Sequence, residues 1–248
     1  MRRLRRAPAA LQLLLGAGLV LSLWLAANGV YQVARKPTEL FFPVRGTLNK
    51  MPLETWRAYG PLFRRYSTSN ITPELLAALA QVEGAGNPVA HTYWRFSFRP
   101  KPFELYRPAS SAVGMYQMTD ATFAEASRYC IREHRVIAAG EDDSACWLNR
   151  LYFRVIPSHA VELTAAYLDV HIGRILSRSG TSRTSLEQKQ RLAAVIHLCG
   201  SGAAELYAQR GFRFSDGERC GDHDPRVYLA RVASMRDVFA RLAARELP

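Results

Sequence analysis

The sequence predicts a mainly helical protein with at most a small β element, preceded by one N-terminal transmembrane helix. Three observations carry this prediction. The chain begins with an apolar run of membrane-spanning length, helix start and stop signals recur through the remainder, and no stretch shows a strong alternating strand pattern. With 248 residues, 48% apolar and 22% charged, the chain can bury a normal core.

Residues 1–36 form the predicted anchor. Four arginines in the first six residues precede an apolar run over residues 7–33, and Arg35-Lys36 close it. About 20 apolar residues span a bilayer. A cleaved signal peptide is the alternative, but the run exceeds a typical signal core and Leu25-Ala26-Ala27 is a poor cleavage site. The arginines predict a cytoplasmic N-terminus and export of everything after Lys36.

The net charge of +12 is unevenly distributed. Six of the 33 basic residues flank the anchor, which leaves 27 basic against 21 acidic residues and a charge of +6 for residues 37–248. This mildly basic domain suits an anionic lipid or an acidic polymer. Predicted export and the lack of a Lys/Arg tract outside the anchor flanks argue against nucleic acid as a partner.

Four cysteines lie in the exported part, and their even number in an oxidising compartment predicts two disulfides. Of the three connectivities we favour the local pairs Cys130–Cys146 and Cys199–Cys220, each contributing about 3 kcal/mol in the chain-entropy model. The alternative is a Cys2His2 metal site, because His197 and His223 stand close to Cys199 and Cys220 in the sequence. The oxidising compartment favours the disulfide, so we predict no metal and no cofactor.

The segment from residue 37 to residue 68 is predicted as a linker with short helices. Residues 38–51, which include Pro43 and Gly46, are expected to be extended. Residues 53–66 have helical composition, but Gly60-Pro61 interrupts it and predicts two short helices.

The next helix ends in an acid. Thr72 is a good N-cap, Pro73 suits the first helical position, and the glycines from Gly84 onward stop the helix. Helical spacing puts Glu83 on the apolar stripe of this helix, at its negative end. Both features disfavour the ionised carboxylate, which would keep Glu83 protonated to act as a general acid. The alternative is a frayed helix end whose carboxylate reaches water.

The rest of the chain alternates irregular segments with helices. Residues 88–108 combine aromatic side chains with four prolines, which suits a packed Ω-like loop or a cleft wall. Helices are predicted over residues 120–129, 147–155, 158–179, 186–198, 203–210 and 225–245.

Four segments, in this order, resemble the soluble-lytic-transglycosylase family of lysozyme-like enzymes, which cleave peptidoglycan glycan strands. The first, Glu83-Gly84-Ala85-Gly86-Asn87-Pro88, is similar to the family's Glu-Ser-x-x-Asn-Pro with its catalytic Glu. The other three are Ser111-Ala112-Val113-Gly114-Met115-Tyr116-Gln117-Met118, Ile196-His197-Leu198-Cys199-Gly200, which stands where the family has Ala-Tyr-Asn-Ala-Gly, and Arg226-Val227-Tyr228-Leu229-Ala230-Arg231-Val232.

This resemblance implies a lysozyme-like domain over residues 69–248, with Glu83 as catalytic acid and then base. Glu83 would protonate the oxygen between MurNAc and GlcNAc and then deprotonate the MurNAc C6 hydroxyl, forming 1,6-anhydroMurNAc. Substrate-binding positions carried over from the motifs are Gln117, Tyr228, Tyr116, Met115 and Asn87, with Tyr228 near the catalytic Glu. A lysozyme-type muramidase and a non-catalytic glycan-binding or scaffold protein are the alternatives.

The chain also departs from the family pattern. Gly84 replaces the usual Ser, Leu198 replaces the usual Asn, and residues 88–108 form a longer segment. These departures indicate a divergent member of the family. The predicted anchor places it in the bacterial inner membrane, with its domain in the periplasm. Its expected partners are peptidoglycan strands, the membrane and, for an anchored enzyme, cell-envelope protein complexes. A muramidase would need a second carboxylate, for which Glu104, Asp120, Glu125 and Glu162 are available.

Overall fold

A computed structural model describes residues 8–44, 46–97, 101–138, 146, 149, 151–180 and 184–246. The described chain is mainly helical, as predicted, and it contains two small two-stranded sheets where at most one small β element was expected. It divides into two compact units. Unit 1 combines Met1–Pro43 with Thr92–Ser111, and unit 2 combines Val44–His91 with Ala112–Pro248. The boundaries predicted after residues 36 and 68 stay predictions.

Unit 1 is built on the apolar helix α1, Ala9–Arg35. By length and composition it could cross a membrane. A 3-10 helix, η2 (Pro37–Val44), follows directly, so the prediction of an extended segment is wrong over these residues. Pro37 suits the start of such a helix, and the buried Glu39 pairs with Lys36 at 2.9 Å, which closes its first turn.

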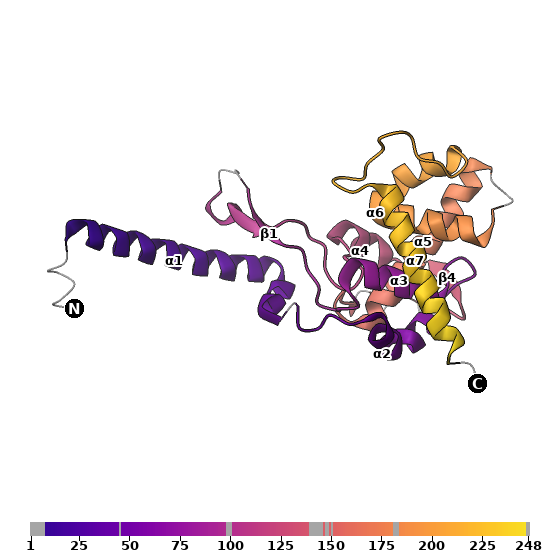
Figure 1. The fold of residues 1–248 in the computed structure, drawn as a ribbon, viewed down its shortest axis with the longest axis horizontal. Coiled ribbons are helices and arrows are strands. Elements are labelled where there is room, and N and C mark those ends of the chain that lie inside the picture. The colour runs from indigo at the N-terminus through magenta and orange to yellow at the C-terminus, as the bar shows by residue number, and fades with distance from the viewer. Residues whose placement is uncertain are drawn as a thin grey trace. The chain divides into compact units, whose positions relative to one another are not determined.

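A hairpin completes unit 1. Strands β1 (Trp94–Phe96) and β2 (Tyr106–Pro108) pair antiparallel, with Phe96 opposite Tyr106, and the short 3-10 helix η3 (Pro102–Glu104) precedes β2. The hairpin lies beside the C-terminal end of α1 (Figure 1), where Asn28 donates to the Tyr106 carbonyl at 2.8 Å. The aromatic segment over residues 88–108 therefore contains an antiparallel β-hairpin in its described part.

Unit 2 holds the main hydrophobic core. Helix α3 lies in this core, with residues 75–80 all buried, and packs against α2 and α7, while α5 packs along α6 (Figure 1). The elements of unit 2 are α2 (Pro52–Arg65), α3 (Pro73–Gly84), α4 (Asp120–Ala126), β3 (Tyr129–Arg132), β4 (Arg135–Ala138), α5 (Pro157–Ser179), α6 (Leu186–Gln209) and α7 (Pro225–Ala244).

Two helix predictions need correction. Helix α2 continues through Pro61, because one face of it buries Trp56 and Phe63 in the core, and this packing outweighs the lost hydrogen bond. Helix α4 ends at Ala126, and the predicted last turn gives way to the β3–β4 hairpin. The break predicted between residues 186–198 and 203–210 is confirmed, since the element α6 consists of two helices that meet at a kink, where Gly200 has a non-helical backbone. The helix predicted over residues 147–155 lies partly outside the described residues.

Both local disulfides are confirmed. Cys130 pairs with Cys146, and Cys199 pairs with Cys220, with Cα–Cα distances of 5.5 and 5.1 Å. Since Cys199 and Cys220 bond to each other, neither supplies a thiolate to the alternative Cys2His2 site.

Candidate functional site

The candidate site is centred on Glu83 in the last turn of α3. The helix begins as its signals predict, since the Thr72 hydroxyl accepts from the Leu75 amide at 3.3 Å. It ends at Ala85, whose left-handed backbone (φ 50°) turns the chain away. The side chain of Glu83 keeps 18% of its surface exposed, in a helix whose preceding turns are buried. Glu83 is thus an acid at the edge of the core.

Tyr228 contacts this carboxylate from a distant part of the chain. Its hydroxyl donates to Glu83 Oε1 at 2.5 Å. Helix α7 places it one turn after the Asp224 N-cap, which accepts from the Arg226 amide at 2.8 Å. Burial, then the negative charge and hydrogen bond of Glu83, raise the Tyr228 pKa well above its usual 10. Tyr228 therefore stays protonated and remains a hydrogen-bond donor.

His197 approaches the same oxygen from α6. Its Nε2 lies 3.6 Å from Glu83 Oε1, and 13% of its side-chain surface is exposed. Within the described chain, Glu83 Oε2 accepts no hydrogen bond. From the sequence, His197 is predicted only as a ligand of the alternative metal site, although its place in the third motif, before Leu198, is a signal for this site.

A kink and a disulfide position the two groups that contact Glu83. Gly200, with φ 80° and ψ 168°, interrupts α6 three residues after His197. Cys199 beside it is bonded to Cys220, which precedes α7 by a short loop. The disulfide therefore links the end of the helix that carries His197 to the start of the helix that carries Tyr228.

The second motif forms a tight turn against α3. Val113 pairs with Met118, and the Gly114 backbone has φ 82°, a conformation that favours glycine. A Cβ at Gly84 would lie 2.8 Å from the Met115 Cα and 2.9 Å from the Met115 carbonyl oxygen. The family's Ser therefore does not fit at position 84 unless this turn moves, which explains the glycine next to Glu83.

The other predicted site residues do not meet Glu83. Met115 and Tyr116 are buried, and the Tyr116 hydroxyl donates to the Leu76 carbonyl at 3.2 Å, so its ring offers no face to a sugar. Asn87 is also buried, and it binds Asn49 and the Val89 amide, each at 2.9 Å. These three side chains support the site from the core.

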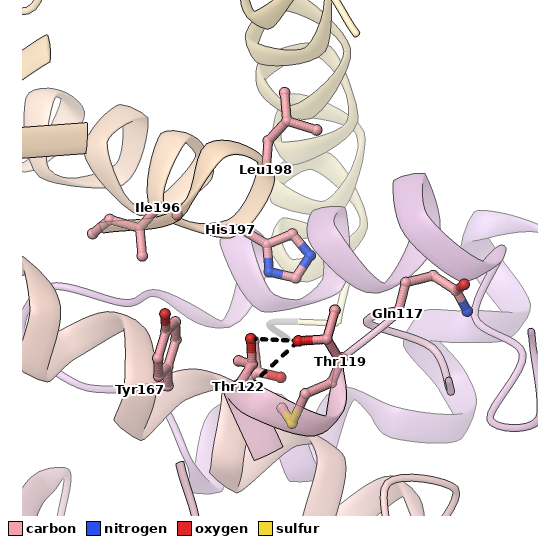
Figure 2. A pocket seen from close by; sticks show the side chains of 10 residues that line it. Gln117, Thr119, Thr122, Tyr167, Ile196, His197 and Leu198 are labelled. Carbon is pink, nitrogen blue, oxygen red and sulfur yellow. Dashed lines mark hydrogen bonds between the residues drawn. The ribbon is translucent and has the colours of Figure 1, made fainter. Parts of the chain in front are cut away.

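Gln117 borders the site without contacting Glu83. Its Nε2 donates to the carbonyls of Ala90 and Gly114, at 3.0 and 2.9 Å. Its backbone has φ 46°, so the turn imposes a conformation that non-glycine residues rarely adopt. In Figure 2 the Gln117 amide points away from His197.

A pocket of about 210 Å³ adjoins His197. Figure 2 shows His197 projecting from α6 toward Thr119 and Thr122. At its base Thr164 is 2% exposed, and its hydroxyl has no hydrogen-bond partner among the described residues. The lining residues are mostly polar or small: Gln117, Met118, Thr119, Thr122, Thr164, Tyr167, Ile196, His197, Leu198 and Gly200.

The carboxylates available to a muramidase are engaged elsewhere. Asp120 binds Arg154 at 2.6 Å, and Glu125 binds His171 at 3.0 Å. Glu162 is 1% exposed and accepts from the Ile131 amide and the Tyr152 hydroxyl. Glu104 belongs to unit 1. In the described part of unit 2, no second carboxylate contacts Glu83.

Comparison of the chain with protein-family models, curated proteins and solved structures finds no match. The site itself offers one partly exposed carboxylate, fixed at one oxygen by a buried hydroxyl, faced by an imidazole and open at its other oxygen. Such a group can give a proton to a bound substrate and take one back.

Proposed function

We propose that this protein is a membrane-anchored peptidoglycan lytic transglycosylase with a lysozyme-like domain. It cleaves the MurNAc–GlcNAc bond and leaves 1,6-anhydroMurNAc. The observation that carries the proposal is the hydrogen bond from Tyr228 to Glu83. The resemblance predicts this meeting of two motifs that lie 145 residues apart, and general helical packing would not require it.

In the proposed reaction, Glu83 uses its two oxygens differently. Oε2 carries the proton and delivers it to the glycosidic oxygen as the C1–O bond breaks and positive charge develops on the sugar. The resulting carboxylate then removes the proton of the MurNAc C6 hydroxyl, whose oxygen bonds to C1. Tyr228 donates to Oε1 in both protonation states, so the carboxyl keeps its orientation through both steps.

His197 and the pocket are proposed to serve orientation and substrate binding. His197 lines the pocket, and its Nε2 lies 3.6 Å from Glu83 Oε1, so it connects the pocket to the carboxyl group. The threonine hydroxyls and the Tyr167 phenol match the hydroxyl and amide groups of an amino sugar. Gln117 also lines this pocket.

The proposed location is the bacterial inner membrane, with α1 as a single span and unit 2 in the periplasm. Two features support it: an N-terminal helix long and apolar enough to cross a membrane, and two disulfides, which form in oxidising compartments. Peptidoglycan strands are the proposed substrate, and envelope complexes are the proposed class of protein partner.

Mass spectrometry of the products tests the proposal. The purified full-length protein in detergent is incubated with peptidoglycan sacculi, alongside the variant Glu83→Gln. We expect 1,6-anhydro ends from the wild type and none from the variant. Reducing ends would show a muramidase, absence of products from both proteins would show a glycan-binding role, and full activity of Glu83→Gln would overturn the assignment of the acid.

A further inference from the structure

The burial pattern of α1 is unusual for an isolated anchor. Its buried side chains are the polar ones, Asn28 and Gln32, while its apolar side chains are exposed. Asn28 Nδ2 donates to the Tyr106 carbonyl at 2.8 Å, and Gln32 Nε2 donates to the Phe103 carbonyl at 2.6 Å. The two are four residues apart and share one face. The hairpin is therefore seated on the last two turns of α1.

Further contacts fix this junction. The rings of Tyr31 and Phe103 stack with centroids 5.2 Å apart, and Arg35 pairs with Glu104 at 3.5 Å. The indole of Trp94 donates to Glu39 at 2.8 Å. Side chains from α1, η2 and the hairpin thus form one folded unit. A signal peptide that is removed by cleavage would have no use for such contacts with the rest of the chain.

The geometry of α1 gives the depth of this junction. The turns from Ala9 to the residue before Asn28 rise about 28 Å at about 1.5 Å per residue, close to the roughly 30 Å of a bilayer's hydrocarbon core. Polar side chains and open backbone groups are costly in hydrocarbon. Asn28, Gln32 and the strand carbonyls that accept from them therefore lie at the outer edge of the core, in the headgroup layer.

The surface of unit 1 suits that layer. Tyr93, Phe96 and Leu40 are 64%, 72% and 68% exposed, and aromatic side chains are enriched where membrane meets water. Residues 1–43 and 92–111 contain only two acids, Glu39 and Glu104, and both are buried in ion pairs. The exposed charges of the described hairpin are cations, such as Arg95 and Lys101.

We propose that unit 1 carries a juxtamembrane collar, formed by residues 37–43, 92–97 and 101–111, which binds the phospholipid headgroups of the membrane that α1 spans. The aromatic side chains enter the interface, and the cations favour anionic lipid. The collar rests on the proposed membrane span and is independent of the proposed glycan chemistry.

Tryptophan quenching in vesicles tests the collar. The full-length protein is reconstituted in phosphatidylcholine–phosphatidylglycerol vesicles with and without lipids brominated near the headgroup end of the acyl chains. The variant Phe96→Trp adds an indole to the collar. Subtracting the fluorescence of the wild type from that of the variant leaves the fluorescence of the added indole. Phe153→Trp is the matched control, since Phe153 is 61% exposed in unit 2. We expect several-fold stronger quenching of the indole added at position 96.

A double variant tests the seating of the hairpin. Asn28→Leu with Gln32→Leu removes both donors and leaves α1 more apolar, so the span persists while the hairpin loses its two bonds. In the Phe96→Trp background we expect this change to reduce the quenching. Trp24 lies in α1. The fluorescence that is lost in the variant Trp24→Phe therefore reports whether α1 lies in the bilayer.

The outcomes separate the collar from the two other proposals. Strong quenching of Trp24 with no more quenching at position 96 than at position 153 overturns the collar and leaves the anchor standing. Weak quenching of Trp24, together with an intact mass showing a chain cleaved before Asn28, overturns both. Digestion of sacculi in detergent reports the glycan chemistry separately from either result.

Discussion

In the described part of unit 2, two carboxylates each accept a hydrogen bond from a tyrosine, and one of the two is open. Tyr228 donates to Glu83 at 2.5 Å, and Tyr152 donates to Glu162 at 2.7 Å. The second oxygen of Glu162 accepts from the Ile131 amide at 2.9 Å, and the residue is 1% exposed. The second oxygen of Glu83 has no partner among the described residues, and its side chain is 18% exposed.

A histidine accompanies each pair. His159 stacks on Tyr152 with centroids 3.9 Å apart, and its Nδ1 accepts from the Phe153 amide at 3.1 Å. His197 lies 3.6 Å from Glu83 and borders a pocket. The same three residue types thus make a closed structural network in one place and an open site in the other. Residue type alone does not distinguish the two places. They differ in whether the second oxygen of the carboxylate accepts a hydrogen bond.

The largest effect should come from Glu83→Gln. Loss of a general acid costs about 10²–10⁴-fold in rate, and we expect kcat for sacculus digestion to fall within that range. Stability should change little, because the amide oxygen can still accept from Tyr228 and the site is partly exposed. Product release followed by mass spectrometry gives the rate, and thermal denaturation in detergent gives the stability.

Glu162→Gln is the matched control for this variant. An amide has one acceptor oxygen where Glu162 uses two, so one of its buried donors loses its partner. That loss costs about 1–3 kcal/mol of stability. We expect a lower Tm with unchanged kcat per folded molecule. If Glu162→Gln reduced kcat as much as Glu83→Gln, the distinction between an open and a closed carboxylate would fail.

Tyr228→Phe should have the next largest effect. A hydrogen bond to a charged group contributes about 1.5–3 kcal/mol, so we expect kcat to fall about 10- to 100-fold as Glu83 loses its orientation. Tyr152→Phe removes the equivalent bond from Glu162, and it should lower Tm while kcat stays constant. Equal kcat for wild type and Tyr228→Phe would remove Tyr228 from the mechanism.

Glycine substitutions show how tightly each region is packed. A Cβ at Gly84 would meet the Met115 backbone at 2.8 Å, whereas nothing lies within 4 Å of a Cβ at Gly173 in α5. We expect Gly84→Ala to destabilise the protein by about 1–3 kcal/mol through overpacking. Gly173→Ala should stabilise it by up to about 1 kcal/mol, because alanine is the better helix former. Denaturant titration in detergent measures both signs, and a stabilising Gly84→Ala would contradict the close contact.

These comparisons also show what the sequence could predict. Local signals predicted the start of α3 and placed Glu83 in its last turn, because Thr72, Pro73 and the glycines from Gly84 onward act within one turn of the helix ends. The contact between Glu83 and Tyr228 spans 145 residues, so only a resemblance could suggest it. The break at Gly200 and the Cys199–Cys220 disulfide were both predicted, but the sequence does not show that they direct His197 toward Glu83, because that depends on how α3 and α6 pack.

Strand pairing was the least predictable feature. The strands β1 to β4 are three or four residues long, too short for an alternating pattern. The β3–β4 turn uses Glu133 and His134 in left-handed conformations, with φ of 47° and 63°, where Asn-Gly would have been the recognisable signal. The hairpin of unit 1 depends on contacts with α1, which lies more than 60 residues earlier in the chain.

His197→Gln should have a smaller effect than the changes above. The imidazole Nε2 lies 3.6 Å from Glu83 Oε1, beyond hydrogen-bond distance, so we expect kcat to fall by at most about 5-fold, with little change in Tm. Product release followed by mass spectrometry measures kcat. A kcat equal to that of the wild type would remove His197 from the mechanism.

The smallest effect concerns the histidine of the closed network. Burial lowers the His159 pKa below its usual 6.5, and the negative charge of Glu162 opposes this only in part. Protonation would also break the bond that Nδ1 accepts from the Phe153 amide. The folded protein therefore binds this proton less readily than the unfolded chain does. The stability that results is complete above about pH 6.5 and is lost as the pH falls through the lowered folded-state pKa. In His159→Asn the amide oxygen can still accept from Phe153 and nothing titrates, so Tm should fall less between pH 7.5 and 5 than in the wild type. Parallel thermal denaturation across that range measures the difference, and identical pH dependence in both proteins would exclude His159 as its source.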